Sequence, residues 1–230
     1  MISSVIILVL IVLISNIVAN EVRVTCIGDS ITAGNTSCLS SSYTVNLQTI
    51  LGNEYIVTNA GKSSMTMLRE GLCHDGSSEK CSYWDTEEMQ IAFSSQPHIV
   101  TIMLGTNDGK YFNWEGVQDT GDYYVLDYID MIQRLKKLNP MPKVYVMIPP
   151  PIWIDGVFGM NATIINSTLP ILLRHMADVI KSDVDGVIDI HTAIISSNLP
   201  SDVLTCDGCH PKKITNQIIA QTIADAITKI

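Results

Sequence analysis

The sequence lacks long basic segments and repeated metal-ligand motifs. Its net charge is −9 at pH 7, and no run of Lys or Arg is longer than the pairs Lys136–Lys137 and Lys212–Lys213. A chain of this charge repels a polyanion, which argues against nucleic acid as a partner. The single Cys-x-x-Cys, at Cys206 and Cys209, has no second such pair and no paired histidines beside it, so we expect no zinc site.

Segments that would divide the chain are also missing. No repeat, low-complexity stretch or linker interrupts residues 21–230, and this length suits one globular domain with a full core. No Gly-x-Ser-x-Gly sequence occurs, which argues against the standard α/β-hydrolase fold. We therefore expect a single domain of another architecture over residues 21–230.

The longest apolar run is too short to span a membrane. It covers Val5–Ile14, whereas a spanning helix needs about 20 apolar residues. The run is followed by the small residue Ala19, a pattern typical of a secretory signal peptide over residues 1–20, cleaved after Ala19 or Asn20. No Lys or Arg precedes the run, so an anchor is the alternative. We expect secretion to the extracellular space or the secretory-pathway lumen, with no stable membrane anchor.

Secretion would permit disulfide bonds and glycosylation. We expect Cys73 and Cys81 to pair, because they bracket a polar, turn-rich segment with no core of its own. Glycosylation sequons begin at Asn35, Asn161 and Asn166. All six cysteines follow residue 20; the others are Cys26, Cys38, Cys206 and Cys209.

Short apolar runs alternate with longer segments of helical spacing. The expected strands are Val22–Ile27, Tyr55–Thr58, Ile99–Leu104, Lys143–Ile148 and Gly186–Ile190. The expected helices are Tyr43–Leu51, Tyr124–Leu138, Leu169–Lys181 and Ile214–Ile227. Continuous apolar character suits strands buried on both faces, so this alternation predicts a three-layer α/β/α domain with a five-stranded parallel sheet.

In such sheets, functional side chains follow the carboxyl ends of the strands. A Gly-Asp-Ser after the first strand ends on Ser30, which suits an ordinary turn or a nucleophile at a helix start. Gly61 follows the second strand and is either a turn glycine or a close backbone donor. Asn107 follows the third and is either a helix cap or a side-chain amide donor.

Near the C-terminus, Asp207 precedes His210 by three residues in a loop that contains a glycine. A carboxylate at this spacing can accept from Nδ1–H and leave Nε2 to take a proton from a serine. A surface loop with a solvated histidine is the alternative. Cys206 and Cys209 flank the loop. We favour a disulfide between them that stiffens it, with pairing of either to Cys26 or Cys38 as the alternative.

These four segments, in this order and at these strand ends, resemble the SGNH hydrolases, also called GDSL lipases or acylhydrolases, over residues 22–230. The resemblance implies a flavodoxin-like sheet with strand order 2-1-3-4-5. It also implies a catalytic triad of Ser30, Asp207 and His210. The implied oxyanion hole consists of the N–H groups of Ser30 and Gly61 and the side chain of Asn107.

The reaction implied is hydrolysis of a carboxylic ester through a covalent acyl-enzyme, with no metal or other cofactor. A mature chain of about 210 residues has little room for a large lid or a long acyl tunnel, so we expect short-chain esters such as O-acetyl groups on carbohydrates. Within the family, a lysophospholipase or other lipid acylhydrolase is the alternative. A non-catalytic glycan-binding module is the alternative from another class.

Two loops are expected over the mouth of the site, Gly116–Thr120 and Trp153–Met160. In or beside them, Trp114, Trp153 and Phe158 suit contact with a sugar or an acyl chain, or simple packing within the protein.

Overall fold

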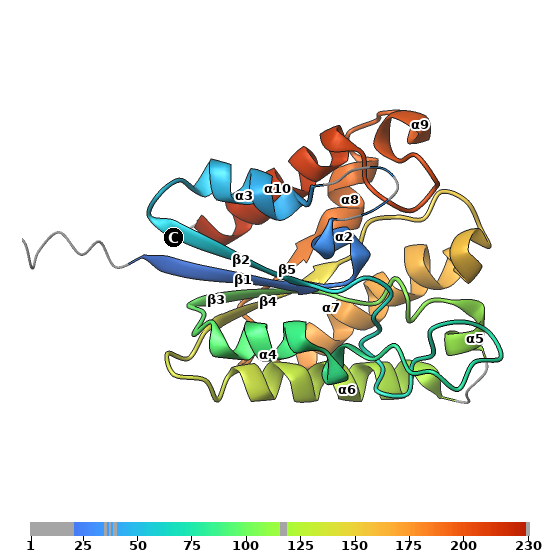
Figure 1. Cartoon of the computed structure of the whole chain (residues 1–230), viewed down its shortest axis with the longest axis horizontal. Coiled ribbons are helices and arrows are strands. Elements are labelled where there is room, and N and C mark those ends of the chain that lie inside the picture. The colour runs from blue at the N-terminus through green and yellow to red at the C-terminus, as the bar shows by residue number, and fades with distance from the viewer. Residues whose placement is uncertain (1–20, 35, 37, 39–40, 116–118, 229–230) are drawn as a thin grey trace, which may run out of the picture.

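The computed structural model describes residues 21–34, 36, 38, 41–115 and 119–228. Five parallel strands form one sheet in the order β2-β1-β3-β4-β5 (Figure 1). The strands are β1 (Val22–Gly28), β2 (Tyr55–Gly61), β3 (Ile99–Met103), β4 (Lys143–Ile148) and β5 (Gly186–Asp189). This confirms the predicted fold class and strand order. The expected signal peptide and the sequon at Asn35 lie outside the described residues.

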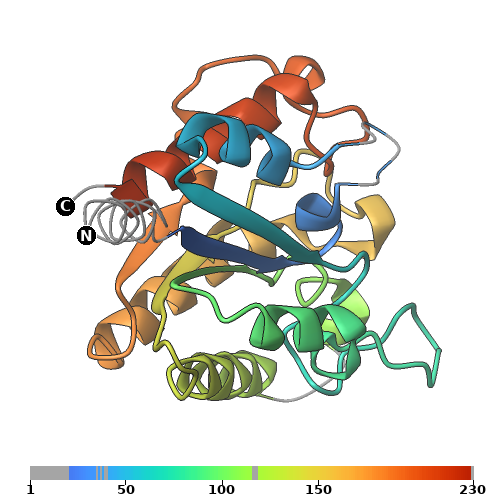
Figure 2. The ribbon, with the colours of Figure 1, turned by 60° about the vertical axis from the view of Figure 1, so that its left-hand side comes forward.

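Helices cover both faces of the sheet (Figures 1 and 2). One face carries α3 (Tyr43–Leu51), α8 (Ile190–Ile195) and α10 (Lys213–Thr228). The other carries α4 (Glu87–Ser94), α6 (Thr120–Leu135) and α7 (Leu169–Val179). Shorter helical segments lie in the connections: α2 (Ser30–Ala33), α5 (Tyr111–Trp114), α9 (Ser201–Leu204), η1 (Tyr83–Asp85), η2 (Val157–Gly159) and η3 (Ile164–Thr168).

The sheet separates two hydrophobic cores, because its central strands are apolar on both faces. All five residues of β3 are buried. Alternate residues of this strand enter different cores: Val100 and Ile102 pack with α6 and α7, whereas Ile99 and Met103 pack with α3 and α10. The continuous apolar run in the sequence is thus explained by burial on both sides. No helix in the described part of the chain is long and apolar enough to cross a membrane.

The carboxyl ends of the strands bring distant segments together. Helix α2 follows β1 directly, the loop with Asn107 follows β3, and the connection from α9 to α10 lies at the same edge (Figure 1). The segment after β4 reaches this edge too, since the Trp153 N–H donates to the Gly208 carbonyl at 2.9 Å. The expected site residues therefore lie on loops at one end of a rigid sheet.

Candidate active site

Ser30 occupies the turn from β1 into α2. Asp29 caps this short helix, since its Oδ1 accepts from the Ile31 N–H at 2.9 Å. Ser30 is therefore the first helical residue, and its own N–H has no hydrogen-bond partner among the described residues. Gly28 permits this tight turn, because a Cβ there would lie 2.1 Å from Thr32 Oγ1. The turn leaves the Ser30 hydroxyl partly exposed and directed at the C-terminal loop.

Ser30, His210 and Asp207 form one hydrogen-bonded chain. Ser30 Oγ lies 3.0 Å from His210 Nε2, and His210 Nδ1 lies 2.7 Å from Asp207 Oδ2. When Nδ1–H donates to the carboxylate, Nε2 is left as the acceptor for the serine proton. The structure thus joins residues 180 positions apart in the arrangement of a nucleophile, a base and an orienting acid.

Asp207 also holds the backbone of its own loop. Its Oδ1 accepts from the N–H groups of His210, at 2.7 Å, and Cys209, at 3.0 Å. Burial alone would raise the pKa of Asp207, but the hydrogen bonds from the His210 ring and from these two N–H groups outweigh it. They hold the pKa of this carboxyl at about 2. Asp207 is therefore ionised at neutral pH and is positioned through both of its oxygens.

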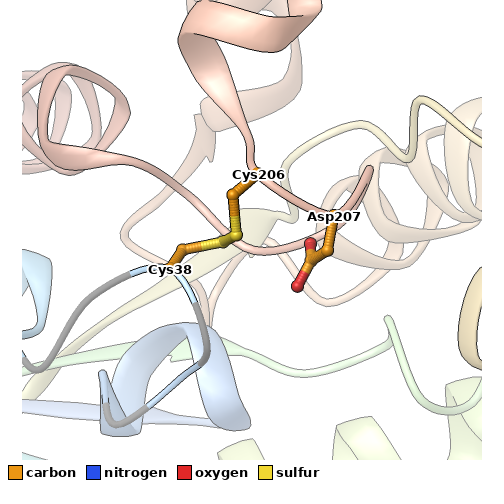
Figure 3. A group of neighbouring side chains, drawn as sticks. All are labelled: Cys38, Cys206 and Asp207. Carbon is orange, nitrogen blue, oxygen red and sulfur yellow. A yellow bond between two sulfur atoms is a disulfide. The ribbon is translucent and has the colours of Figure 1, made fainter.

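The disulfide next to this loop differs from the one that we favoured. Cys206 pairs with Cys38, from the connection between α2 and α3, and Figure 3 shows this bridge beside Asp207. Cys209 is a buried free thiol that packs in the core, and burial raises its pKa. The expected pairing of Cys206 with Cys209 is wrong, because Cys209 points into the core and Cys206 faces the loop that follows the serine.

The other predicted bridge is confirmed. Cys73 and Cys81 form a disulfide with a Cα–Cα distance of 4.8 Å. It closes a surface loop between β2 and α4. Cys26, in the buried strand β1, carries the second free thiol of the described chain.

Asn107 lies in the loop after β3 and is almost fully buried. Its Nδ2 donates to the Met65 carbonyl at 3.2 Å, and its own carbonyl accepts from Asn113 Nδ2 at 3.0 Å. The neighbouring Asp108 accepts from the N–H groups of Met67, at 3.0 Å, and Leu68, at 2.8 Å. Asn107 is therefore fixed against the segment that follows β2.

Gly61 does not have the free N–H that the resemblance implies. It ends β2, and its N–H donates to Asn59 Oδ1 at 2.9 Å. A Cβ at this position would lie 2.3 Å from the Ala33 backbone nitrogen, so close packing against α2 requires the glycine. The expected role of Gly61 as an oxyanion donor is thus not supported by the geometry.

No sequence pattern singles out the turn just beyond Gly61. Among the described residues, the backbone N–H groups of Ser63, Ser64 and Met65 have no hydrogen-bond partner. Ser64 has a φ of 71°, a left-handed conformation that is uncommon for a non-glycine residue. The same turn contacts Asn107 through the Met65 carbonyl. A positive-φ serine has no signal in the sequence, since glycine or asparagine is the usual residue there.

The two sequons inside the described structure begin at engaged asparagines. Asn161 is 8% exposed and its Nδ2 donates to Glu115 Oε1 at 2.9 Å. Asn166 donates from Nδ2 to the Ile152 carbonyl and accepts from the Ile152 N–H, both at 2.8 Å. A glycan on either Nδ2 would replace these contacts. Asn161 and Asn166 stay candidate glycosylation sites, and the hydrogen bonds of both side chains disfavour them as acceptors.

The loop aromatics have different surroundings. Trp114 packs on Tyr124, with ring centroids 5.9 Å apart, and is partly buried against the first core. Trp153 is partly buried against the second core. Phe158 is exposed and its ring lies 5.5 Å from that of His210. Part of the other expected mouth loop, residues 116–118, lies outside the described residues.

The chain is similar in sequence to known proteins. A model of the GDSL-like Lipase/Acylhydrolase family matches residues 26–218. An acetylxylan esterase of Xylanibacter ruminicola is 30% identical, over 90% of this chain and 43% of that protein. The chain thus spans less than half the length of this curated relative.

Solved structures share the fold. A carbohydrate acetylesterase from Sinorhizobium meliloti has a TM-score of 0.66 and 24% identity, over 90% of this chain and 98% of that one. An aryl esterase of M. smegmatis has a TM-score of 0.67 and 20% identity, with the same two coverages. At these identities, the likeness is evidence about architecture alone.

Proposed function

Since the chain belongs to the GDSL-like lipase/acylhydrolase family, a family of carboxylic ester hydrolases, we propose that it hydrolyses short acyl esters with Ser30, His210 and Asp207 as its catalytic triad. The observation that carries this proposal is the continuous chain of hydrogen bonds from Ser30 Oγ to His210 Nε2 and from His210 Nδ1 to Asp207 Oδ2. A serine hydroxyl becomes nucleophilic when a positioned base takes its proton.

The reaction follows from these contacts in two balanced halves. His210 Nε2 takes the Ser30 proton while Oγ attacks the acyl carbonyl carbon. The imidazolium, held by the Asp207 carboxylate, then gives this proton to the alcohol oxygen as the ester C–O bond breaks. In the second half, water gives a proton to His210, attacks the acyl-serine and releases the acid. The proton returns to Ser30 Oγ.

The carbonyl oxygen needs donors where its negative charge develops. We assign this role to the Ser30 N–H, at the start of α2, and to Asn107 Nδ2. The third donor comes from the free backbone N–H groups of Ser63–Met65, in place of Gly61. Two features support this choice: the Gly61 N–H is engaged by Asn59, and the Met65 carbonyl already contacts Asn107.

For the substrate, we infer an O-acetyl group on a carbohydrate. The acetylxylan esterase relative supports this class. A lipid acylhydrolase and a non-catalytic glycan-binding module are the rival outcomes of the test below.

We also infer that the protein is secreted, with residues 1–20 as a cleaved signal peptide. The Cys38–Cys206 and Cys73–Cys81 bridges support this inference, because disulfides persist in oxidising compartments. N-terminal sequencing of the protein recovered from the medium tests it. The expected first residue is Asn20 or Glu21.

An active-site serine phosphonate tests the catalytic proposal directly. We expect one covalent adduct, which peptide mass mapping places on Ser30, and no adduct after heat denaturation. A panel of esters of one alcohol with acyl chains of increasing length then tests the substrate class. We expect the highest kcat/KM for acetyl. A protein that never reacts with the phosphonate is a binding module, and a maximum at long acyl chains identifies a lipid acylhydrolase.

A further inference from the structure

Phe158 presents an exposed aromatic ring beside the proposed general base. The residue is 53% exposed, and its ring plane is tilted by 57° to that of His210 at a centroid distance of 5.5 Å. Its backbone has φ 51° and ψ 24°, a left-handed conformation that a bulky L-residue rarely adopts. Residues in such conformations cluster at functional sites, where the surrounding structure imposes them.

The loop that carries Phe158 is held from two directions. Asp155 Oδ2 accepts from the Tyr111 hydroxyl at 2.9 Å, which ties the loop to α5. The Trp153 N–H donates to the Gly208 carbonyl at 2.9 Å, which ties it to the loop of the proposed base. The Phe158 ring therefore has a defined position relative to His210, although more than half of it faces solvent.

This position lies on the alcohol side of the scissile ester. His210 must give a proton to the alcohol oxygen, so the alcohol has to lie against Nε2. The carbonyl oxygen has to face the other way, toward Asn107 and the Ser30 N–H. A ring beside His210 is therefore within reach of the leaving group.

We propose that Phe158 is a specificity residue that stacks on a pyranose ring in the alcohol part of the ester. This inference rests on the proposed esterase function. A flat apolar ring matches the C–H face of a sugar. The Phe158 loop also carries Asp155, whose carboxylate accepts from the Tyr111 hydroxyl of α5, so polar groups that suit the hydroxyl rim of a sugar are present on the same loop and on the helix it contacts. An acyl chain would instead need an enclosed apolar pocket, and Phe158 is open to solvent.

Two acetyl esters that differ only in the alcohol test the proposal. One is an acetylated xylo-oligosaccharide and the other is ethyl acetate, whose alcohol is too small to reach the ring. We expect Phe158→Ala to lower kcat/KM for the sugar ester by roughly 2- to 10-fold, the range that aromatic contacts of this kind give. Ethyl acetate should be hydrolysed at the wild-type rate. Phe158→Trp should retain the sugar activity, and Phe158→Leu should lose it.

The control variant is Leu126→Ala, which removes another largely exposed apolar side chain (61%) from α6. This variant should hydrolyse both esters with the wild-type kcat/KM. A fall for both esters in Phe158→Ala would mean that the ring merely positions His210, and would overturn the proposal. The proposal would also be overturned if Phe158→Ala hydrolysed the sugar ester with the wild-type kcat/KM, or if the effect of this substitution depended on the length of the acyl chain. If the wild-type protein hydrolyses no ester at all, the proposed function itself fails, and that result is separate from these.

Discussion

Cys38 and Cys206 are joined by a disulfide that links two segments 168 residues apart at the candidate site (Figure 3). Cys206 immediately precedes Asp207. On the other side, Cys38 Sγ lies 3.3 Å from the carbonyl oxygen of His210. The bridge therefore links the connection that follows the Ser30 helix to the residue before Asp207, and it lies against the backbone of His210.

Removal of this bridge should lower both stability and turnover. We expect Cys38→Ser with Cys206→Ser to lower the free energy of unfolding by about 2–5 kcal/mol, because a long loop of the unfolded chain is no longer closed. Turnover should fall too, since the loop that carries the base loses its link to the nucleophile's side. The measurements are urea denaturation and kcat with a fixed acetyl ester.

The Cys73–Cys81 bridge provides the matched control. It joins two residues that are only eight positions apart, and neither of them belongs to the Asp207–His210 loop. Cys73→Ser with Cys81→Ser should therefore cost stability, by roughly 2–3 kcal/mol, while kcat stays near the wild-type value. Equal losses of kcat in both double variants would show that the Cys38–Cys206 bridge has no special relation to the site.

Ser30→Ala should abolish esterase activity and leave the fold intact. The hydroxyl is the atom that forms the acyl-enzyme, and loss of a triad nucleophile costs about 10⁶ in kcat in a well-studied protease. The partly exposed hydroxyl contributes little to the core, so the thermal midpoint should remain close to that of the wild type. Near wild-type turnover by this variant would refute the assignment of the nucleophile.

Asn107→Ala should lower kcat by about 10²–10³ with little change in KM, because its Nδ2 matters most once the oxygen is charged. The side chain is buried and bonded to Met65, so the thermal midpoint has to be compared as well. A variant that keeps kcat but raises KM would identify Asn107 as a binding residue instead.

The raised pKa of the Asp29 carboxyl predicts that stability depends on pH in a defined direction. Burial raises the pKa of this carboxyl from 3.8 to about 6, against the lowering effect of the Ile31 N–H. A raised acid pKa means that its stabilising contribution is complete below pH 3.8 and lost as the pH rises through about 6. Asp29→Asn stays neutral and keeps a capping oxygen. As the pH rises from 3.8 through about 6, the wild type should therefore lose stability relative to this variant. The difference in free energy of unfolding should change by on the order of 2–3 kcal/mol.

Denaturation of both proteins at pH 4, 5.5 and 7 measures this difference. The readout is its change with pH, since any constant effect of the amide cancels. A difference that is independent of pH would show that Asp29 has an ordinary pKa in the folded protein.

Local patterns predicted the fold, and they picked out the side chains of Ser30, Asp207 and His210, which the structure brings together. The strand assignments rest on continuous apolar runs, and β4 and α3 have the predicted bounds. The last helix, expected over Ile214–Ile227, runs from Lys213 to Thr228, with Ile219 and Ile227 buried and Ile214 37% exposed. Ser30 and His210 were identifiable because each follows from residues within a few positions of it.

The remaining features depend on contacts between distant segments. Cys206 had several possible partners, and only the fold decides that Cys38 is the one within reach. Gly61 looked like a free donor because the engagement of its N–H by Asn59 is set by the path of β2. Phe158 and His210 are 52 residues apart in the sequence, and no periodic pattern indicates that their rings lie together.

Asp207 provides the most discriminating prediction, because its two oxygens have separate partners. Oδ1 accepts from the backbone of its own loop, and Oδ2 contacts His210 Nδ1. Asp207→Asn can keep the loop contacts through Oδ1 while its amide offers an N–H to Nδ1, which selects the wrong tautomer. We therefore expect kcat to fall by about 10³–10⁴ at neutral pH, although the fold is preserved.

The pH profile separates this role from a purely structural one. The pKa of Asp207 is held at about 2, below its ordinary 3.8, so its contribution to stability is present above pH 3.8 and lost as the pH falls through about 2. Asp207 thus remains ionised over the whole assay range, so protonation of this carboxyl cannot account for a pH dependence of turnover there. Asp207→Ala, which removes both oxygens, should lose stability as well as turnover. If Asp207→Asn stays within about tenfold of the wild type, far above the triad expectation, Ser30 and His210 act as a dyad and Asp207 only shapes the loop.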